Sequence, residues 1–252
     1  MTTTRIPVIP RREFARQFGN DYSSGQHVTF IGPTQRGKTT LCLDLLSKVI
    51  SPERPCVILA GKPPSRDKAM DEIAPKMLNL RVVEEWPPTR TFRDRKRNGY
   101  VLRPEQKMRS RADDEANLKA QFSKAIMDNY RKKTPTITVA DEAYLVQVTL
   151  KLKGDYEQPL MRGAPHNAMW SLIQRGAYVS YLSYNSPDHI FIFNDPDVAN
   201  RKRYADIGGV DPRLVYDITT TLQTYEIQSG QTISECLYIR RAGPELLIVD
   251  VK

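Results

Sequence analysis

Short apolar runs alternate with amphipathic segments along most of the chain. The run "HVTFI" (27–31) precedes a polar loop, after which apolar side chains recur at helical spacing from Leu41 to Ile50. Similar apolar runs follow at 56–61 and 136–144, with a helical pattern between them. Apolar runs that alternate with helices are typical of a parallel sheet covered by helices. We therefore predict an α/β fold with a mainly parallel central sheet.

The same patterns predict the remaining elements. Strands are expected at 79–86, 100–104, 178–187, 189–195, 235–241 and 245–252. Helices are expected from Asp113 through Leu118, Phe122, Ile126 and Tyr130, and at 168–176, 197–209 and 211–223. Residues 87–107, rich in proline and arginine, are expected to project as a loop around the short strand, and 151–167 also read as loop.

Residues 1–26 are predicted to be a basic N-terminal arm, and residues 27–252 a single domain. Pro7 and Pro10 interrupt the arm, and "RREFARQF" after them could form a short basic helix. The rest of the chain shows no internal repeat, no low-complexity tract and no linker that would divide it.

Bulk composition narrows the class of protein. A length of 252 residues with 40% hydrophobic residues supports a real core. No run approaches the roughly 20 apolar residues that a membrane-spanning helix needs, and the N-terminus lacks the apolar stretch of a secretory signal. Cys42, Cys56 and Cys236 show no metal-ligand spacing, which favours buried thiols in a reducing cytosol. We expect a cytoplasmic protein without an integral membrane segment.

The chain is strongly basic. Its formal charge of +9 and pI near 9.4 favour a polyanionic partner, although a solvated basic surface explains the charge alone equally well. Cations gather beside aromatic residues at 91–100 and 199–209. This pattern suits contacts with a phosphate backbone rather than reading of bases. The candidate contact residues are Arg93, Arg95, Lys96 and Arg97.

A loop between the first strand and the first long helix carries the clearest chemistry. It matches GxxxxGK(S/T), which wraps phosphates in backbone N–H groups at a helix start. The predicted nucleotide-binding residues are Gly32, Pro33, Thr34, Gln35, Arg36, Gly37, Lys38, Thr39 and Thr40. Lys38 would reach the β- and γ-phosphates, and the Thr39 hydroxyl would ligate Mg²⁺. An ordinary strand–helix turn would leave Lys38 without a role.

Two adjacent acids end the core strand "TITVADEAY". Asp141 emerges where open α/β sheets bind ligands, and it could hold Mg²⁺ directly or through water. Glu142 could polarise the water that attacks the γ-phosphate. The two acids could also be a helix start with favourable charges, but their place after a buried strand in an alternating chain favours a hydrolase.

A third polar group is expected beyond the acids. Asn185, at the end of the predicted strand 178–187, could report the state of the γ-phosphate, although a turn residue before Ser-Pro is nearly as plausible. Arg175 could act across a subunit interface in phosphoryl transfer, or simply stabilise the end of a helix. Arg162 and Arg203 are rivals for the first of these roles.

These segments, in this order, resemble the FtsK–HerA group of P-loop motor ATPases. In that group a strand ending in an amide before x-Pro follows the acidic strand, after a helix bearing Arg and Gly. Asn185 and Arg175-Gly176 take those positions here, with Asn in place of the usual Gln. The resemblance covers residues 27 to about 225 and implies a RecA-like core. It also implies a homo-oligomeric ring, a hexamer, that binds ATP and Mg²⁺ between subunits around double-stranded DNA.

A compact basic chain with little beyond the core is similar to viral and phage genome-packaging ATPases. The leading hypothesis is therefore an ATP-driven translocase that packages DNA, docked on a capsid vertex or portal protein, in the host cytoplasm or on the virion. Three alternatives remain: a conjugation or assembly ATPase moving protein or single-stranded DNA, an ATP-dependent remodelling switch, and a P-loop kinase whose arginine-rich lid is 91–97.

Overall fold

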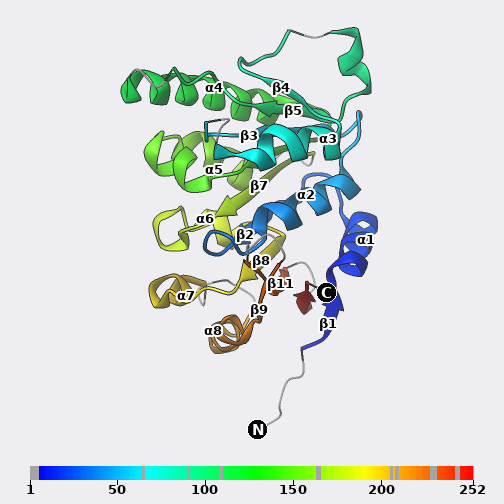
Figure 1. Cartoon of the computed structure of the whole chain (residues 1–252), viewed down its shortest axis with the longest axis vertical. Helices are drawn as coiled ribbons and strands as arrows, with labels where there is room; N and C mark the ends of the chain where they lie inside the picture. The colour runs from blue at the N-terminus through cyan, green and yellow to red at the C-terminus, as the bar shows by residue number, and fades with distance from the viewer. Residues whose placement is uncertain are drawn as a thin grey trace.

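A computed structural model describes most of the chain. The described residues are 6–63, 66–89, 91–107, 110–162, 166–204, 207, 210–227, 232–241 and 245–251. Within them, ten strands form one sheet in the order β1-β12-β11-β8-β2-β7-β6-β3-β5-β4 (Figure 1). These strands are β1 (Val8–Pro10), β2 (Val28–Ile31), β3 (Cys56–Leu59), β4 (Arg81–Val83), β5 (Gly99–Leu102), β6 (Thr136–Ala140), β7 (Asn167–Ile173), β8 (His189–Phe193), β11 (Cys236–Arg240) and β12 (Glu245–Asp250).

The sheet is mostly parallel, as the sequence predicts. Of its described strands, only β11 runs antiparallel to its neighbours β8 and β12. The central strands β8, β2, β7, β6, β3, β5 and β4 all pair in parallel. They therefore share one edge where they begin, called here the amino edge, and one where they end, the carboxyl edge. A separate hairpin joins β9 (Thr224–Glu226) to β10 (Thr232–Ser234).

Helices cover both faces of the sheet (Figure 1). The helices are α1 (Arg11–Asp21), α2 (Lys38–Val49), α3 (Ala74–Leu78), α4 (Arg111–Arg131), α5 (Lys153–Arg162), α6 (Leu182–Asn185), α7 (Val198–Tyr204) and α8 (Pro212–Thr221). Shorter 3-10 and π segments are η2 (Ala69–Ile73), η3 (Phe92–Lys96), η4 (Leu145–Thr149) and η5 (Gly176–Tyr178).

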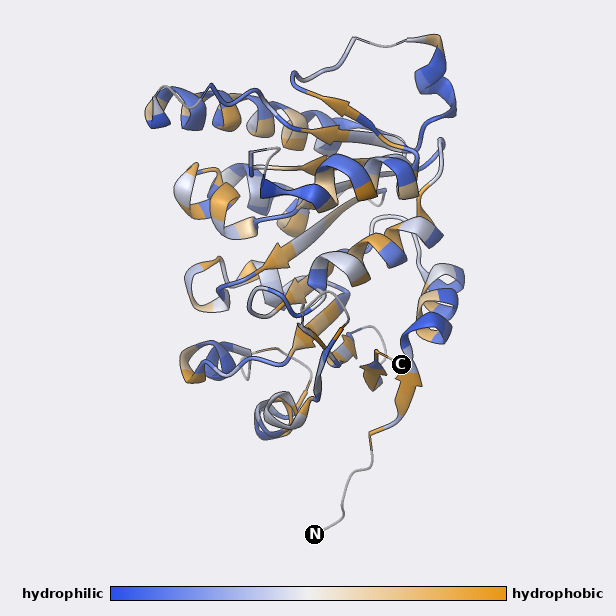
Figure 2. Ribbon diagram, viewed as in Figure 1, coloured by the Kyte–Doolittle hydropathy of each residue, from blue (hydrophilic) through white to orange (hydrophobic). Residues whose placement is uncertain are grey.

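Two hydrophobic clusters lie on opposite sides of the strands. One joins the sheet to α1, α2 and α3 through side chains such as Phe14, Leu45 and Leu78. The other joins it to α4, α5 and the later helices through side chains such as Phe122 and Tyr156. Figure 2 shows the result as apolar strands between helices that each have one apolar and one polar side. Because both faces are covered, central strands appear as continuous apolar runs in the sequence.

Within the predicted N-terminal arm, the described elements β1 and α1 pack on the sheet. β1 pairs in parallel with β12, and α1 buries Phe14, Ala15 and Phe18. Phe18 meets Trp170 and His189 edge-on, with ring centroids 6.0 and 5.0 Å apart. The prolines therefore shape the entry to a helix whose apolar side belongs to the core.

Three predictions in the middle of the chain are wrong. Residues 168–176, expected as a helix, form most of β7, which lies between β2 and β6 and is buried along its whole length. Periodicity cannot separate a fully buried strand from a buried helix. Residues 178–187, expected as a strand, hold the end of η5 and all of α6. Residues 151–167, expected as loop, contain α5, which continues through Pro159.

Candidate nucleotide-binding site

The phosphate loop leaves the end of β2 and closes on the start of α2. Gly32 has φ +151° and Gly37 has φ +89°, a region that side chains rarely adopt. A Cβ on Gly32 would lie 2.8 Å from the Cβ of Phe193, so glycine also lets the loop pass close to β8. The Gly32 N–H donates to the Ile173 carbonyl at 3.0 Å, which ties the loop to the end of β7.

Lys38 is the first residue of α2 and is 6% exposed. Its ammonium donates to the Pro33 carbonyl inside the loop. Burial lowers the pKa of Lys38 to about 8, and the carboxylate of Asp141 opposes that shift. A buried ammonium held inside a loop of this shape is placed to meet an anion at the helix start.

A cavity of about 510 Å³ opens beside this lysine at the carboxyl edge. It brings together the loop residues from Thr34 to Thr40 and the acid Asp141, as the sequence predicts. The remaining lining residues were not predicted: Lys62, Arg66, Asp67, Lys68, Ala69, Leu172, Gln174, Thr232 and Ile233. Its size falls within the range of about 300–1,000 Å³ typical of small-molecule sites.

The two predicted acids lie at the end of β6. Asp141 is 4% exposed, and burial raises its pKa to about 7 while the ammonium of Lys62 works against that rise. Lys62, which follows β3, places its Nζ 3.1 Å from Oε1 of Glu142 and 4.0 Å from Oδ2 of Asp141. Burial alone would lower the pKa of Lys62, but the two carboxylates outweigh it and raise that pKa.

The amide predicted at the end of a strand is Gln174 rather than Asn185. Gln174 directly follows β7, lines the cavity, and donates from Nε2 to Oε1 of Glu142 at 3.3 Å. Asn185 ends α6, three residues before Asp188, whose carboxylate accepts from the His27 N–H at the start of β2. Asn185 therefore lies at the amino edge, away from the phosphate loop. The error follows from the misassigned strand, because the strand that precedes the amide is 167–173.

Arg175 keeps its place next to the site. It is exposed and lines a smaller cavity of about 320 Å³ with Glu142 and Gln174. Its backbone precedes η5 and it does not end a helix. Arg162 and Arg203 are exposed as well, but neither lines this cavity or the one beside Lys38.

The β9–β10 hairpin closes one side of the cavity and was not anticipated. Ser234 donates its backbone N–H to the Arg36 carbonyl at 3.2 Å. Ile233 lies next to Gly37, where an added Cβ would be in ordinary van der Waals contact with its Cγ2, at 3.5 Å. Alternating polar and apolar residues around Tyr225 and Ile233 were the available signal for a hairpin.

The donors in this cavity fit a magnesium ion. Asp141 and Thr39 line it together, and Mg²⁺ prefers a few protein oxygens completed by water and phosphate. Within the described residues, no group of three or more His, Cys, Asp or Glu gathers as a metal centre. One carboxylate and one hydroxyl therefore suit a metal that arrives with a nucleotide better than a resident metal.

The predicted DNA-contact residues lie at the amino edge, opposite this cavity: Arg93, Arg95 and Lys96 are in η3, and Arg97 directly follows it. Asp94 holds the turn together: it accepts from the Thr91 N–H at 2.6 Å and from Nη1 of Arg81 at 2.8 Å. Arg97 takes part in this framework, 3.7 Å from Asp94, and donates to the Leu80 carbonyl. It is therefore committed to the fold of the turn.

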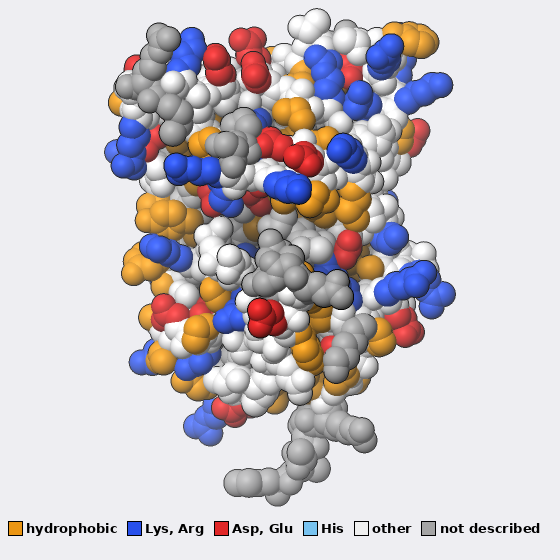
Figure 3. Space-filling model, viewed as in Figure 1, with side chains coloured by type: hydrophobic (Ala, Val, Ile, Leu, Met, Phe, Trp, Pro, Cys, Tyr) orange, Lys and Arg blue, Asp and Glu red, His pale blue; other side chains and the backbone are white. Residues whose placement is uncertain are grey.

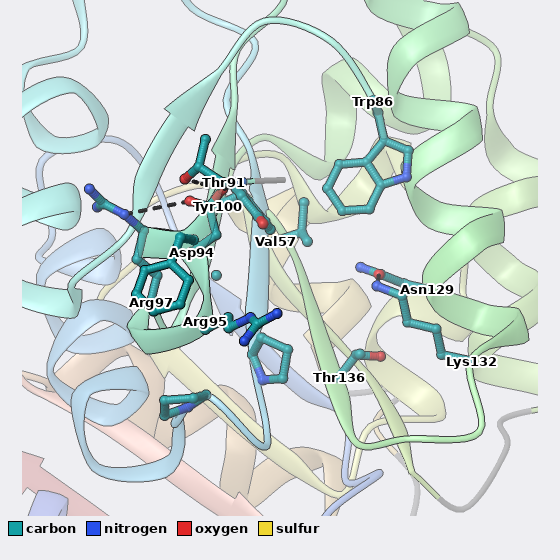
Figure 4. Close-up of a pocket in the computed structure, with 14 residues that line it drawn as sticks. Val57, Trp86, Thr91, Asp94, Arg95, Arg97, Tyr100, Asn129, Lys132 and Thr136 are labelled. Atoms are coloured by element: carbon teal, nitrogen blue, oxygen red, sulfur yellow. Dashed lines mark hydrogen bonds and ion pairs between the residues drawn. The ribbon is translucent and has the colours of Figure 1, made fainter. Parts of the chain in front are cut away.

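The other three cations of η3 are exposed, and one of them faces a hollow. Figure 4 shows Arg95 reaching into a cavity of about 520 Å³, with Asn129 and Lys132 across from it at the end of α4. The guanidinium of Arg95 lies 5.4 Å from the ring centroid of Phe92, whose side chain is 79% exposed. Cations beside aromatics on an exposed turn suit contacts with nucleic acid.

Neither a protein-family model nor a curated protein sequence matches the chain. Solved structures do match it. The genome packaging NTPase B204 from Sulfolobus turreted icosahedral virus 2, in complex with AMPPCP, aligns with a TM-score of 0.53 at 14% identity, over 90% of this chain and 97% of its own. The DNA-packaging ATPase B204 from Sulfolobus turreted icosahedral virus aligns with a TM-score of 0.57 at 15% identity, over 91% and 98%.

This chain has the fold of the B204 packaging ATPases. The conjugation coupling protein TcpA of pCW3, with ATPγS, also aligns, with a TM-score of 0.50 at 11% identity over 90% of this chain and 60% of its own. The predicted P-loop NTPase fold is confirmed. In the described part of the chain, no helix has the length and apolarity to span a membrane.

Proposed function

We propose that this chain is an FtsK–HerA motor that hydrolyses ATP to translocate double-stranded DNA, and that its task is to package a viral genome. The observation that carries the proposal is the meeting of Lys38, Asp141, Glu142 and Gln174 at one edge of the sheet. These four residues lie in segments that follow three neighbouring strands, β2, β7 and β6. The sheet therefore positions the segments that carry them.

Each residue has a role that its position supports. Lys38 binds the β- and γ-phosphates from the helix start. Thr39 and Asp141 hold Mg²⁺, which when bound neutralises charge on the phosphate oxygens. Glu142, beside the cavity, orients and polarises the attacking water as a general base. Gln174, already hydrogen-bonded to Glu142, positions that carboxylate.

The DNA-facing surface is η3. Arg93, Arg95 and Lys96 are its exposed cations, whereas Arg97 holds the turn. Figure 3 shows Lys and Arg side chains gathered at the upper right of the view, the corner where the segment before β5 lies in Figure 1. In the assembly we propose, a homo-oligomeric ring or hexamer carries such a surface on each subunit. Arg175 completes a neighbour's site, and a capsid vertex or portal protein in the host cytoplasm is the docking partner.

A second candidate function is a conjugation or assembly ATPase that moves single-stranded DNA or protein. The likeness to a conjugation coupling protein favours it, since the motor core would be the same. A remodelling switch has less support, because it does not require a water-activating acid such as Glu142. A kinase lid is opposed by geometry: residues 91–97 lie at the amino edge, and the phosphate loop at the carboxyl edge.

The test is ATP hydrolysis by the wild type and by Glu142→Gln, each with and without linear double-stranded DNA. We expect duplex to stimulate the wild type, and Glu142→Gln to lower turnover about 10²- to 10⁴-fold while still binding ATP. Stimulation by single-stranded DNA in preference to duplex would favour the second function. A rate of ATP hydrolysis that changes with neither duplex nor single-stranded DNA would contradict both proposals in which the motor moves DNA.

A further inference from the structure

Lys62 is a charged residue of the site that no sequence motif predicts. It follows β3, between the phosphate loop and the acids, and its ammonium bridges Glu142 and Asp141. We propose that Lys62 is a γ-phosphate ligand: it holds Glu142 when the site has no nucleotide, and transfers to the γ-phosphate when a triphosphate binds. The proposal rests on the nucleotide site proposed above and adds the residue that distinguishes triphosphate from diphosphate.

The backbone places Lys62 beside the acids. Leu59 of β3 is the register partner of Ala140 of β6, so the segments after both strands leave the sheet at the same level. Gly61 then passes so close to Leu145, just beyond the acids, that an added Cβ would lie 2.0 Å from its Cδ2. The Gly61 carbonyl also accepts from the side chain of Gln106 at 2.9 Å. Lys62 thus projects from a rigid point.

Its ammonium nevertheless has room to move. The Lys62 side chain is 36% exposed and lines the same cavity as Lys38 and Thr39. A lysine has four side-chain carbons and rotatable donors, so a short swing can exchange one anion for another. The two carboxylates hold the Lys62 ammonium only while the cavity contains no anion that binds it more strongly. A divalent cation at Asp141 would repel the ammonium, and the γ-phosphate would attract it.

This exchange has a direct consequence for Glu142. While Lys62 and Gln174 both bond to its Oε1, the carboxylate is held by two donors. Once Lys62 leaves, Glu142 keeps the Gln174 contact and gains an accessible oxygen for water. A diphosphate lacks the group that would draw Lys62 away. The Lys62 side chain therefore links binding of a triphosphate to release of the Glu142 carboxylate, which acts as the general base.

The experiment measures equilibrium binding of Mg-AMPPNP and Mg-ADP to the wild type and to Lys62→Met. Because one charge-assisted hydrogen bond to the γ-phosphate is lost, AMPPNP should bind about tenfold more weakly or worse. ADP should change less than about threefold, so the preference for triphosphate collapses. Lys62→Gln, which keeps much of the volume, should give the same result. Equal weakening of both nucleotides, or of neither, would overturn the proposal.

Lys68→Met is the matched control. Lys68 lines the same cavity and is exposed, and no ion pair joins it to the acids among the described contacts. Its loss should affect AMPPNP and ADP alike. A loss of triphosphate preference in Lys68→Met as large as in Lys62→Met would show a general charge effect and count against a specific ligand.

A second experiment measures the coupling between Lys62 and Glu142 in the ligand-free protein and again with nucleotide bound. Thermal unfolding of Lys62→Met, Glu142→Gln and the double variant should be non-additive in the ligand-free protein, because the two side chains bond to each other. The coupling should vanish in saturating Mg-AMPPNP. Coupling that persists unchanged would show that Lys62 stays on Glu142 and would refute the exchange. A wild type that binds neither nucleotide would overturn the proposed function itself, which is a distinct outcome.

Discussion

The two edges of the sheet bury ionisable groups in opposite ways. At the carboxyl edge, Lys38 and Asp141 are 6% and 4% exposed and lie in a network of opposite charges with Lys62 and Glu142. At the amino edge, His27 and His189 are 8% and 2% exposed and bond to neutral partners or backbone groups. Burial lowers the pKa of both histidines, that of His189 to about 4.

This difference distinguishes a cavity that suits a charged ligand, at the carboxyl edge, from a structural core, at the amino edge. Buried charges are costly unless they are paired, so a cavity that keeps several of them is organised around a charged ligand. Neutral imidazoles cost less and serve packing: His189 bonds to Tyr238 at 2.8 Å and contacts Phe18 edge-on. At η3 on the same edge, Arg93, Arg95 and Lys96 are exposed, and the one carboxylate of that turn, Asp94, is paired with Arg81. The comparison therefore supports the nucleotide site proposed at the carboxyl edge, and a packing role for the buried histidines at the amino edge.

The largest expected effect is on the amino-edge scaffold. Phe18→Ala should lower the free energy of unfolding by about 3–5 kcal/mol, because it leaves a cavity among Trp170, Tyr22 and His189. Denaturant titration measures it, and nucleotide affinity of the folded fraction should stay within about twofold. A loss of less than 1 kcal/mol would mean that the N-terminal segment is an independent arm after all.

The second-largest expected effect is a loss of folding stability at low pH, caused by His189 at the same edge. The folded pKa of His189 is about 4 and its ordinary value is 6.5, so unfolding takes up a proton between these values. The stabilisation is present above pH 6.5 and is lost as pH falls toward 4, by about 3 kcal/mol in all. Urea titrations of the wild type and His189→Gln across this range measure it. Identical pH slopes in the two proteins would refute the role of His189.

A smaller effect separates the two amides. Gln174→Ala should lower turnover about tenfold, since Glu142 loses its remaining neutral donor. Asn185→Ala, at the other edge, should change turnover less than twofold. Steady-state ATP hydrolysis by both variants measures these effects. A larger loss of turnover in Asn185→Ala than in Gln174→Ala would support the catalytic role of Asn185 instead.

The sequence predicts the carboxyl edge better than the amino edge for a physical reason. The phosphate loop and the two acids are local patterns, because glycine torsions and a strand followed by charge are encoded in consecutive residues. The loop and Asp141 line one cavity as expected, and Glu142 lies next to it, in the smaller cavity with Gln174. Lys62 and the β9–β10 hairpin join them only through strand order and register, which no local pattern contains.

The misassigned strand and the misplaced amide have one source. "NAMWSLI" is apolar throughout because β7 is covered on both faces, and this removes the periodicity that would identify a strand. A helix predicted over 168–176 displaces the expected amide from Gln174 to Asn185, eleven residues later in the chain. The missed helix α5 has a different source: it contains Pro159, and proline usually ends a helix.

The most direct test of the two-edge account is ATP hydrolysis by a variant in which Arg93, Arg95 and Lys96 are all alanine, with and without linear duplex. Its control removes three exposed cations elsewhere, Arg12, Arg16 and Lys48, on α1 and α2. We predict that the η3 variant keeps the wild-type basal rate and loses stimulation by duplex, while the control keeps both. Full stimulation in the η3 variant would contradict the account, and so would a basal rate that falls along with the stimulation.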